Sequence, residues 1–430
     1  MWVRKRIDIA WSDLAFGMRS CSAPVDRRRI ADGVEAIWSP GGAALATLSV
    51  RSGFDLLLAA MNLPRGSEVA VSAVTIPDMV RIIRNHHLVP VPVDLDIERL
   101  TPRLDLLRRA VTPRTRAILV THLFGGRIPL EPVLEIARPL GVPVIEDCAQ
   151  AYDGPGYTGH AGAEVTMFSF GSIKTSTALG GGLLRVRDGA LLERMRTLHE
   201  QYPVQGRREY FQRLLKYAAM RTVSSRPMFR MLTSGCRLVG CDYDCMINNT
   251  VRGFPGPRFF ERIRRQPSAP LLALLRRRLE RFDPDRLARR REQGRLLVDL
   301  LDGRVDRPGV DVSPHSHWVF PVLVDDPREA MGALARAGFD ANQGGSLCVV
   351  SPPDGRGDLF AHEADRTLQR LIYLPLYPEM PSRAVRRMAA AMLEFHRVAR
   401  RQTADARPIH AAQDGLSPAV VAHGESFANQ

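Results

Sequence analysis

Two short stretches of this 430-residue sequence decide its fold: Val144-Ile145-Glu146-Asp147-Cys148-Ala149-Gln150 and Met167-Phe168-Ser169-Phe170-Gly171-Ser172-Ile173-Lys174. Each begins as a short apolar run, the pattern of a buried strand, and each run ends in polar residues. In an open parallel sheet, ligands bind at the edge where the carboxyl ends of the strands meet. We therefore expect Asp147, Ser169 and Lys174 to lie together at that edge.

The sequence around these stretches alternates β-branched runs with helical patterns from about residue 50 to 200, which is typical of a parallel sheet with crossover helices. We expect strands at 68–74, 89–93, 116–121, 142–146, 165–169 and 183–186, and helices at 54–61, 78–85 and 132–138. Further helices are expected at 271–279, 286–301, 328–338 and 383–398, and further strands at 317–324 and 371–374. The fold class is α/β: a large, mostly parallel open sheet flanked by helices, plus a smaller C-terminal α/β domain.

The chain is longer than a single hydrophobic core usually supports. We expect a large domain over residues 1–200 that begins with an arm of about 40 residues, and a basic helical insert over 201–267. A small domain with a linking helix would follow over 268–402. The polar, weakly patterned residues 403–430 predict a flexible tail.

Arginine supplies nearly all of the positive charge. The formal net charge is +14, yet Lys5, Lys174 and Lys216 are the only lysines. A lysine amine can lose its proton when it is desolvated and then attack a carbonyl, whereas a guanidinium stays protonated. A lysine that persists in such a sequence suggests a chemical task, and Lys174 is the one that follows a predicted strand.

Several classes of protein do not fit the composition. The arginines are spread along the chain without a recognised nucleic-acid-binding motif, so we expect no nucleic-acid partner. The spacing of Cys236, Cys241 and Cys245 matches no common zinc or iron–sulfur pattern, so we expect no metal. We find neither the apolar segment of a signal peptide nor a run long enough to span a membrane, so we expect a cytoplasmic protein.

The chemistry of the two opening stretches suits pyridoxal phosphate (PLP). This cofactor needs an amine for its aldehyde, an anion opposite its pyridine nitrogen and donors for its phosphate, which Lys174, Asp147 and Ser169 could supply. A carboxylate within a few Å of a titrating group typically shifts its pKa by about 1–3 units, enough to keep the pyridine protonated near neutral pH. The alternative is that Asp147 only caps a helix, a task that asparagine or serine performs equally well.

Motifs along the chain carry a family resemblance. They are Ser52-Gly53-Phe54, Thr75-Ile76, His122-Leu123-Phe124-Gly125, Glu146-Asp147-Cys148-Ala149-Gln150, Phe168-Ser169-Phe170 followed by Lys174, Gly181-Gly182 and Leu374-Pro375-Leu376-Tyr377. With them the chain resembles the DegT/StrS family of nucleotide-sugar aminotransferases, which are PLP enzymes of fold type I. The resemblance covers about residues 45–200, and 285–395 more loosely.

The resemblance implies roles for individual residues. Lys174 would hold PLP as a Schiff base and move the proton during catalysis, and Asp147 would pair with the pyridinium. Gln150 would contact the phenolic oxygen of the ring, and Ser169 would bind the phosphate. We expect His122 to be structural, because nothing in the sequence places it over the ring.

Other positions depart from the family pattern. Gly53 and Phe54 would offer backbone N–H groups to the phosphate at a helix N-terminus, but Phe54 replaces a threonine hydroxyl. Ile76 replaces the aromatic residue that stacks on the ring, and Thr175 replaces an asparagine that reaches the phosphate of the neighbouring subunit. These changes leave the cofactor chemistry intact and put the identity of the substrate in doubt.

The resemblance implies a PLP-dependent aminotransferase. It would move an amino group from an amino-acid donor to a keto group of a nucleotide-linked sugar, or of a related intermediate of polysaccharide or natural-product biosynthesis. Such enzymes are at least dimers, so a homodimer is expected. The alternatives are a PLP lyase or dehydratase on the same scaffold, and a PLP-binding regulatory protein with a basic nucleic-acid-binding surface. Lys174 argues against the dehydratases of the family, in which a histidine replaces the lysine.

The basic insert has an amphipathic helical pattern. Phe211, Leu214, Leu215 and Ala218 fall at helical spacing among Arg207, Arg208, Arg213, Lys216, Arg221, Arg226, Arg230 and Arg237. We expect a cover over the active site or the dimer interface, in which the arginines could meet the diphosphate of the acceptor. Peripheral contact with anionic lipid is the alternative.

Overall fold

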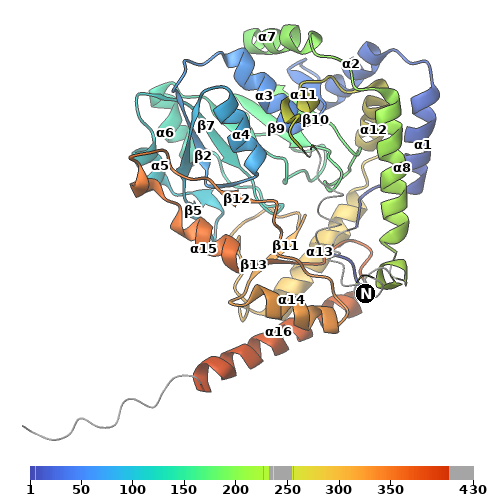
Figure 1. Ribbon diagram of the computed structural model, residues 1–430, viewed down its shortest axis with the longest axis vertical. Coiled ribbons are helices and arrows are strands. Elements are labelled where there is room, and N and C mark those ends of the chain that lie inside the picture. The colour runs from blue at the N-terminus through green and yellow to red at the C-terminus, as the bar shows by residue number, and fades with distance from the viewer. Residues whose placement is uncertain (5, 226, 232–235, 237–253, 255, 406–430) are drawn as a thin grey trace, which may run out of the picture.

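The computed structural model describes residues 1–4, 6–225, 227–231, 236, 254 and 256–405. Arg226, Arg237, Cys241 and Cys245 of the predicted insert lie outside this part of the chain, as does the predicted tail from residue 406 on. A seven-stranded sheet lies at the centre of the fold, in the order β1-β10-β9-β8-β7-β2-β4 (Figure 1).

The strands of the large sheet are β1 (Ala44–Thr47), β2 (Glu68–Ser72), β4 (Val89–Val93), β7 (Thr115–Thr121), β8 (Val144–Asp147), β9 (Val165–Ser169) and β10 (Gly182–Val186). β4, β2, β7, β8 and β9 run parallel, whereas β10 is antiparallel to both of its neighbours, β9 and β1. The predicted mostly parallel α/β sheet is therefore confirmed. The short edge strand β1 was missed.

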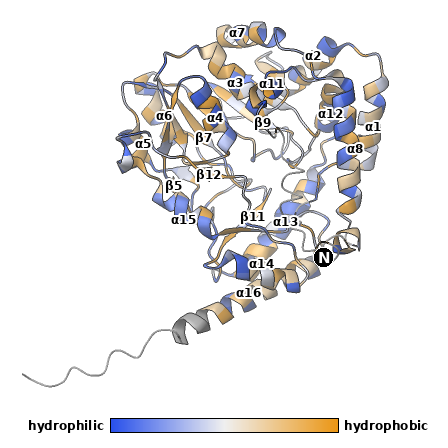
Figure 2. Ribbon diagram, in the orientation of Figure 1, coloured by the Kyte–Doolittle hydropathy of each residue, from blue (hydrophilic) through white to orange (hydrophobic). Residues whose placement is uncertain are grey.

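Helices cover both faces of the sheet. α3 (Val50–Met61), α4 (Pro77–Asn85) and α7 (Gly189–Glu200) pack on one face, and α5 (Leu104–Ala110), α6 (Glu131–Ala137) and α15 (His362–Arg370) on the other. In β7, the side chains of Ala117 and Leu119 pack on the side of α3, α4 and α7. Those of Ile118 and Val120 pack on the side of α5, α6 and α15. Burial on both faces explains why the central strands are almost continuously apolar. Figure 2 shows hydrophobic residues along these strands and hydrophilic ones on outer helices such as α15.

A group of helices packs at the β1 end of the sheet. It consists of α1 (Trp11–Ser22), α2 (Arg27–Trp38), α8 (Arg207–Val223) and α12 (Ala269–Glu280), so the first 40 residues, predicted as an arm, contain two helices. The predicted apolar face of α8 is wrong in part. Tyr210, Leu214 and Tyr217 are buried, while Phe211 and Leu215 remain 37% and 47% exposed, because neighbouring helix positions point about 100° apart.

The C-terminal part of the chain contains a smaller sheet. β11 (Phe320–Leu323) pairs antiparallel with β13 (Leu371–Leu374), and α13 (Pro284–Leu301), α14 (Pro327–Arg336) and α16 (Ser382–Asp405) contribute to the core around it. β12 (Cys348–Val349) instead pairs with β3 (Val74–Thr75), which follows β2. The boundaries at residues 200, 267 and 402 stay a prediction.

The remaining short elements are β5 (Leu95–Asp96), β6 (Thr101–Pro102), η1 (Arg138–Leu140), α11 (Phe259–Ile263) and η2 (Gly357–Leu359). Among the described residues, none of the helices combines the length and the apolar character needed to cross a bilayer.

Candidate active site

Asp147 is the last residue of β8, at the carboxyl edge of the large sheet, and is only 5% exposed. Its Oδ1 atom accepts a hydrogen bond of 2.9 Å from the Ala149 N–H, and its Oδ2 atom has no partner among the described residues. Burial raises the pKa of the Asp147 carboxyl, although the charge of Lys174 opposes this shift. No helix begins between β8 and β9, all of whose connecting residues are described, so the helix-cap alternative is wrong.

Lys174 lies in the turn that follows β9. Its Nζ atom lies 4.0 Å from the centroid of the Trp318 ring, and Trp318 Nε1–H donates to the Ile173 carbonyl over 2.9 Å. Burial lowers the pKa of the Lys174 amine from 10.5 to about 7, although the charge of Asp147 opposes the shift. A large fraction of this amine is therefore neutral, and nucleophilic, near physiological pH.

Gln150 and Ser169 lie at the same edge of the sheet. The Gln150 Oε1 atom accepts a hydrogen bond of 2.9 Å from the Phe124 N–H, which leaves its NH₂ group without a partner in the described part of the chain. Ser169 is the half-buried last residue of β9. Its hydroxyl oxygen accepts a hydrogen bond of 3.4 Å from the Gly171 N–H. The structure thus brings Asp147, Lys174, Gln150 and Ser169 to the same region.

The structure places Gly53 and Phe54 inside a helix rather than at its first turn. α3 begins at Val50, and the Gly53 N–H already donates to the Ser49 carbonyl over 2.9 Å. The Phe54 ring is fully buried in the core on that face of the sheet. For these reasons the Gly53 N–H is not available to a phosphate, and the N–H groups that α3 offers are those of Val50 and Arg51.

A close backbone approach fixes the position of this helix N-terminus. A Cβ atom on Gly182 of β10 would lie 2.7 Å from both the carbonyl carbon of Ser49 and the nitrogen of Val50, so only glycine fits. Ile76, expected at the cofactor-binding position where the family has a ring-stacking aromatic residue, is the N-cap residue of α4 and packs half-buried against the neighbouring core.

A buried polar cluster lies behind Asp147. His122 Nδ1 accepts the Ile128 N–H, so its Nε2–H donates to Glu146 Oε1 over 2.8 Å. Glu146 also accepts hydrogen bonds from the Tyr157 hydroxyl and from the His160 N–H. Burial alone would raise the pKa of Glu146, but these partners, His122 first, lower it to about 2. Both ring nitrogens of His122 are engaged, in accord with the structural role expected for it.

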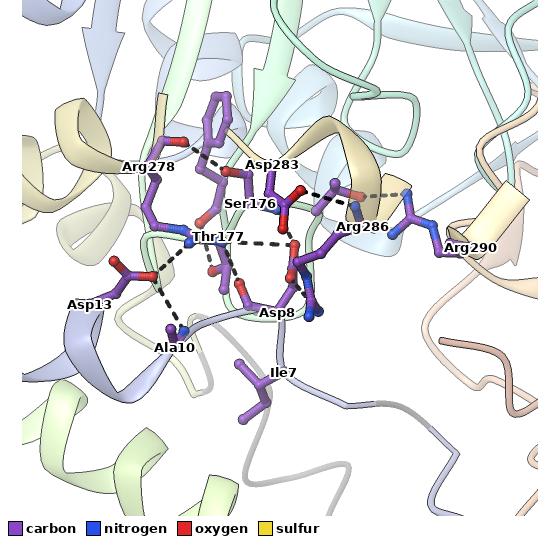
Figure 3. A network of polar contacts seen from close by, with 12 residues as sticks. Ile7, Asp8, Ala10, Asp13, Ser176, Thr177, Arg278, Asp283, Arg286 and Arg290 are labelled. Carbon is purple, nitrogen blue, oxygen red and sulfur yellow. Dashed lines mark hydrogen bonds and ion pairs between the residues drawn. The ribbon is translucent and has the colours of Figure 1, made fainter. Parts of the chain in front are cut away.

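Three further residues adjoin Lys174, and sequence analysis identified none of them. Arg290 of α13 donates from Nη2 to the Thr175 hydroxyl over 3.2 Å, so Thr175 is engaged within its own chain. Asp8 accepts a hydrogen bond of 2.7 Å from the Ser176 N–H and one of 3.0 Å from Arg286 Nη2 (Figure 3). Trp318, Asp8 and Arg290 come from segments far from Lys174 in sequence, so no local motif signals their presence.

These residues surround a cavity of about 130 Å³ beside Lys174. Lys174, Thr175 and Ser176 line one side of it, and Trp318 and Arg290 line another. Asp8 and its neighbours from the N-terminal segment form a third wall (Figure 3). Because Lys174 itself lines the cavity, the cavity is the candidate substrate site.

Several solved structures share the architecture of this chain. The aminotransferase TlmJ from Streptoalloteichus hindustanus matches with a TM-score of 0.67 at 20% identity, over 93% of this chain and 100% of that chain. The sugar aminotransferase CalS13 from Micromonospora echinospora matches with 0.62 at 20% identity, over 92% and 100%. The PLP form of Spr1654 from Streptococcus pneumoniae matches with 0.64 at 15% identity, over 92% and 98%. The fold is that of the PLP-dependent transferases of fold type I.

The family follows from the sequence of the large-sheet region. Residues 40–222 match the model of the DegT/DnrJ/EryC1/StrS aminotransferase family. The resemblance predicted from the motifs is therefore confirmed over this part of the chain.

Proposed function

We propose that this protein transfers the amino group of an amino-acid donor to the keto group of a nucleotide-linked sugar. The observation that carries the proposal is that Lys174 and Asp147 lie near the same edge of the sheet, where the charge of each opposes the pKa shift that burial causes in the other. Among the described residues, Asp147 Oδ2 and the Lys174 amine have no hydrogen-bond partner. The sugar acceptor is supported by the family match and by the structural similarity to CalS13, a sugar aminotransferase.

The residues present fit PLP. The free Oδ2 atom of Asp147 is suited to hold the proton of a pyridine nitrogen, and the free NH₂ group of Gln150 can donate to the phenolic oxygen. Ser169 and the first turn of α3 offer donors for a phosphate. When bound, PLP supplies an electron sink for breaking the Cα–H bond of the donor.

Lys174 would do the proton chemistry. A group with a pKa of about 7 both accepts and releases a proton readily at neutral pH, which is the requirement for general acid–base catalysis. The indole of Trp318 covers one side of the amine and keeps water away from it. Asp147, fixed by the Ala149 N–H, would hold the ring in one orientation relative to Lys174.

The direct test is a two-substrate assay with the PLP-loaded protein. A panel of amino acids is offered together with keto sugars linked to a nucleoside diphosphate, and formation of the 2-oxo acid and of the amino sugar is followed by mass spectrometry. Equal amounts of both products support the proposal. Ammonia release or dehydration without an amino sugar would contradict it and favour a lyase, which neither the family match nor the neighbouring structures support.

We extend the proposal to a cytoplasmic homodimer that serves polysaccharide or natural-product biosynthesis. Its support is the family match, because enzymes of this type complete their active sites across a two-fold interface. Sedimentation of the active protein tests the assembly. A fully active monomer would contradict it.

A further inference from the structure

Large hydrophobic side chains gather on one face of the molecule, away from the cavity beside Lys174. Among the described residues, eleven large hydrophobic side chains are exposed to solvent. Six of these eleven belong to α1, to α8 or to the segments next to α8, and they are Trp11, Val204, Phe211, Leu215, Met228 and Met231. A concentration of exposed apolar side chains is typical of a surface that binds a partner.

α1 and α8 bring these side chains together. The two helices pack against each other along one margin of the molecule (Figure 1). A Cβ atom on Gly17 of α1 would lie only 2.9 Å from Leu214 Cδ2 of α8. The Arg221 guanidinium, near the end of α8, lies 5.7 Å from the centroid of the Trp11 ring at the start of α1. The helices are therefore antiparallel neighbours, and their outward sides adjoin.

The outward side of α8 is a stripe of exposed residues at helical spacing. Arg208, Phe211, Leu215 and Ala219 are separated by three or four positions, and all four are exposed. The outward face of a surface helix is usually polar, so two large apolar side chains in the middle of this stripe are unusual. Removing them from water against a partner would be favourable in free energy.

The segment that contains α8 is also strongly basic. Between residues 204 and 231, Glu209 is the only acidic residue, against seven basic ones: Arg207, Arg208, Arg213, Lys216, Arg221, Arg226 and Arg230. Glu209 itself pairs over 2.7 Å with Arg265, which lies outside this segment. The charge of the segment would therefore be complemented by an anionic partner.

Charge and apolar area together select the kind of partner. In a two-fold dimer through this face, the basic segment of one copy would meet the same segment of the other, and like charges would repel. Nucleic acid would pair with the basic residues but would leave the aliphatic side chains of Leu215, Met228 and Met231 without apolar contacts. A membrane surface with anionic headgroups offers phosphates to the basic residues and acyl chains to the apolar ones.

We propose that the face formed by α1 and α8, here named the α1–α8 face, docks this protein on a membrane surface that contains anionic lipid. Phe211 and Leu215 would enter the boundary between headgroups and acyl chains, while Arg208 and Lys216 would stay at the level of the headgroups. The contact would be peripheral, because no helix in the described part of the chain can cross a bilayer. The proposal concerns where the protein works and does not depend on the reaction at Lys174.

Sedimentation of the PLP-loaded protein with vesicles tests the docking. We expect the wild-type protein to sediment with vesicles of phosphatidylcholine and phosphatidylglycerol, and not with phosphatidylcholine alone. Each basic residue close to an anionic surface should strengthen binding about five-fold. Added salt should weaken binding, because it screens exposed charges. A wild-type protein that does not bind the anionic vesicles would overturn the proposal without the need for any variant.

The apolar part of the contact is tested by the double variant Phe211→Ser/Leu215→Ser. It should bind the anionic vesicles about ten-fold more weakly than the wild type, because it loses the side chains that enter the lipid. The matched control is Leu140→Ser/Phe360→Ser, which changes two hydrophobic residues that are 55% and 38% exposed in other parts of the chain. This control should bind as the wild type does.

The electrostatic part is tested by Arg208→Gln/Lys216→Gln, which should bind the anionic vesicles about ten- to thirty-fold more weakly. Its control is Arg108→Gln/Arg328→Gln, which removes the same charge from exposed positions on α5 and α14. If both pairs weakened binding equally, net charge and not the α1–α8 face would be responsible, and the proposal would fail.

Three further results would overturn the proposal by assigning the face to another partner. One is a change in the mass of the vesicle-free assembly for the Phe211/Leu215 variant with unaltered vesicle binding, which would indicate a contact between copies. Another is a higher acceptor KM for the Arg208/Lys216 variant with unaltered vesicle binding, which would assign these residues to the acceptor diphosphate. The third is binding of a DNA fragment in place of vesicles.

Discussion

The amine of Lys174 lies 4.0 Å from the centroid of the Trp318 ring, and the two residues come from different parts of the chain. Trp318 precedes β11 of the smaller sheet, whereas Lys174 follows β9 of the large one. The indole hydrogen bond to Ile173 fixes this arrangement. The environment that depresses the pKa of the lysine is therefore assembled from both sheets.

Lys174→Ala and Lys174→Arg should lose the yellow colour of the lysine-bound cofactor together with turnover, since neither side chain can form the covalent bond to the aldehyde. Absorbance spectra and the amino-transfer assay measure the two effects. Lys216→Ala, on the exposed surface of α8, is the control and should behave as wild type. Full transamination by either Lys174 variant would refute the assignment, whereas residual noncovalent binding of PLP would not.

Asp147→Asn should fold normally and lose activity by about ten- to a thousand-fold, because a carboxylate shifts the pKa of the ring nitrogen by about 1–3 units and an amide does not. Circular dichroism and steady-state kinetics report the two properties. If turnover stayed normal, Asp147 would only stabilise the turn after β8 through its hydrogen bond to the Ala149 N–H, and it would not be a cofactor ligand.

Uptake of PLP by the cofactor-free protein should depend on pH with a midpoint near 7. The neutral form of Lys174 is the nucleophile, and its pKa is about 7, so the rate should level off above pH 7 and fall about tenfold per unit below it. Stopped-flow absorbance measures the rate. A midpoint near the ordinary lysine value of 10.5 would show that the amine is hydrated and not desolvated.

Trp318→Ala should move this midpoint upward. The indole affects the lysine in two opposing ways: its ring face favours the charged amine by about 0.5–2 kcal/mol, and its bulk excludes water, which favours the neutral amine. Burial is the larger influence on Lys174, so admission of water should dominate. Trp318→Phe, which keeps most of the bulk, should shift the midpoint less. A downward shift in the alanine variant would mean that the cation–π contact outweighs exclusion of water.

The buried Glu146 should make the protein acid-sensitive. Its pKa is lowered from 4.5 to about 2 in the folded state, so its contribution to stability is present above pH 4.5 and is lost as the pH falls toward 2. The shift corresponds to about 3 kcal/mol. Glu146→Gln should lower the free energy of unfolding at pH 7 and flatten its decline below pH 4.5, as measured by urea titration. Glu135→Gln, on the exposed surface of α6, should have neither effect.

The large sheet was predictable because its signals are local. The strands at 89–93 and 165–169 were predicted at their observed bounds, since β-branched runs between turns are informative by themselves. Asp147 and Lys174 could be found in the same way, because each follows directly from a strand end. β1 is only four residues long and gives a weak signal, and this explains why it was missed.

The missing site residues depend on tertiary packing. Arg290 lies in a helix rich in arginines, and nothing in its own sequence context distinguishes it from exposed Arg289. The Gly53 N–H was assigned to a phosphate because the motif suggested a helix start there, but Ser49 caps α3 earlier. The outward-facing Phe211 and Leu215 show the same limit, since helical spacing does not identify which face a neighbour covers.

The pairing of β12 with β3 connects the C-terminal part of the chain to the segment that leads into α4. Cys348 and Val349 are hydrogen-bonded in register with Thr75 and Val74, and the Val350 N–H adds a bond of 2.8 Å to the Ala73 carbonyl. Backbone ladders of this kind resist stretching, so a displacement of the segment around β12 is transmitted to the chain leading into α4. The position expected to face the cofactor ring, Ile76, directly follows Thr75. Movements of the segment around β12 should therefore change the position of Ile76, and with it the site expected for the cofactor ring.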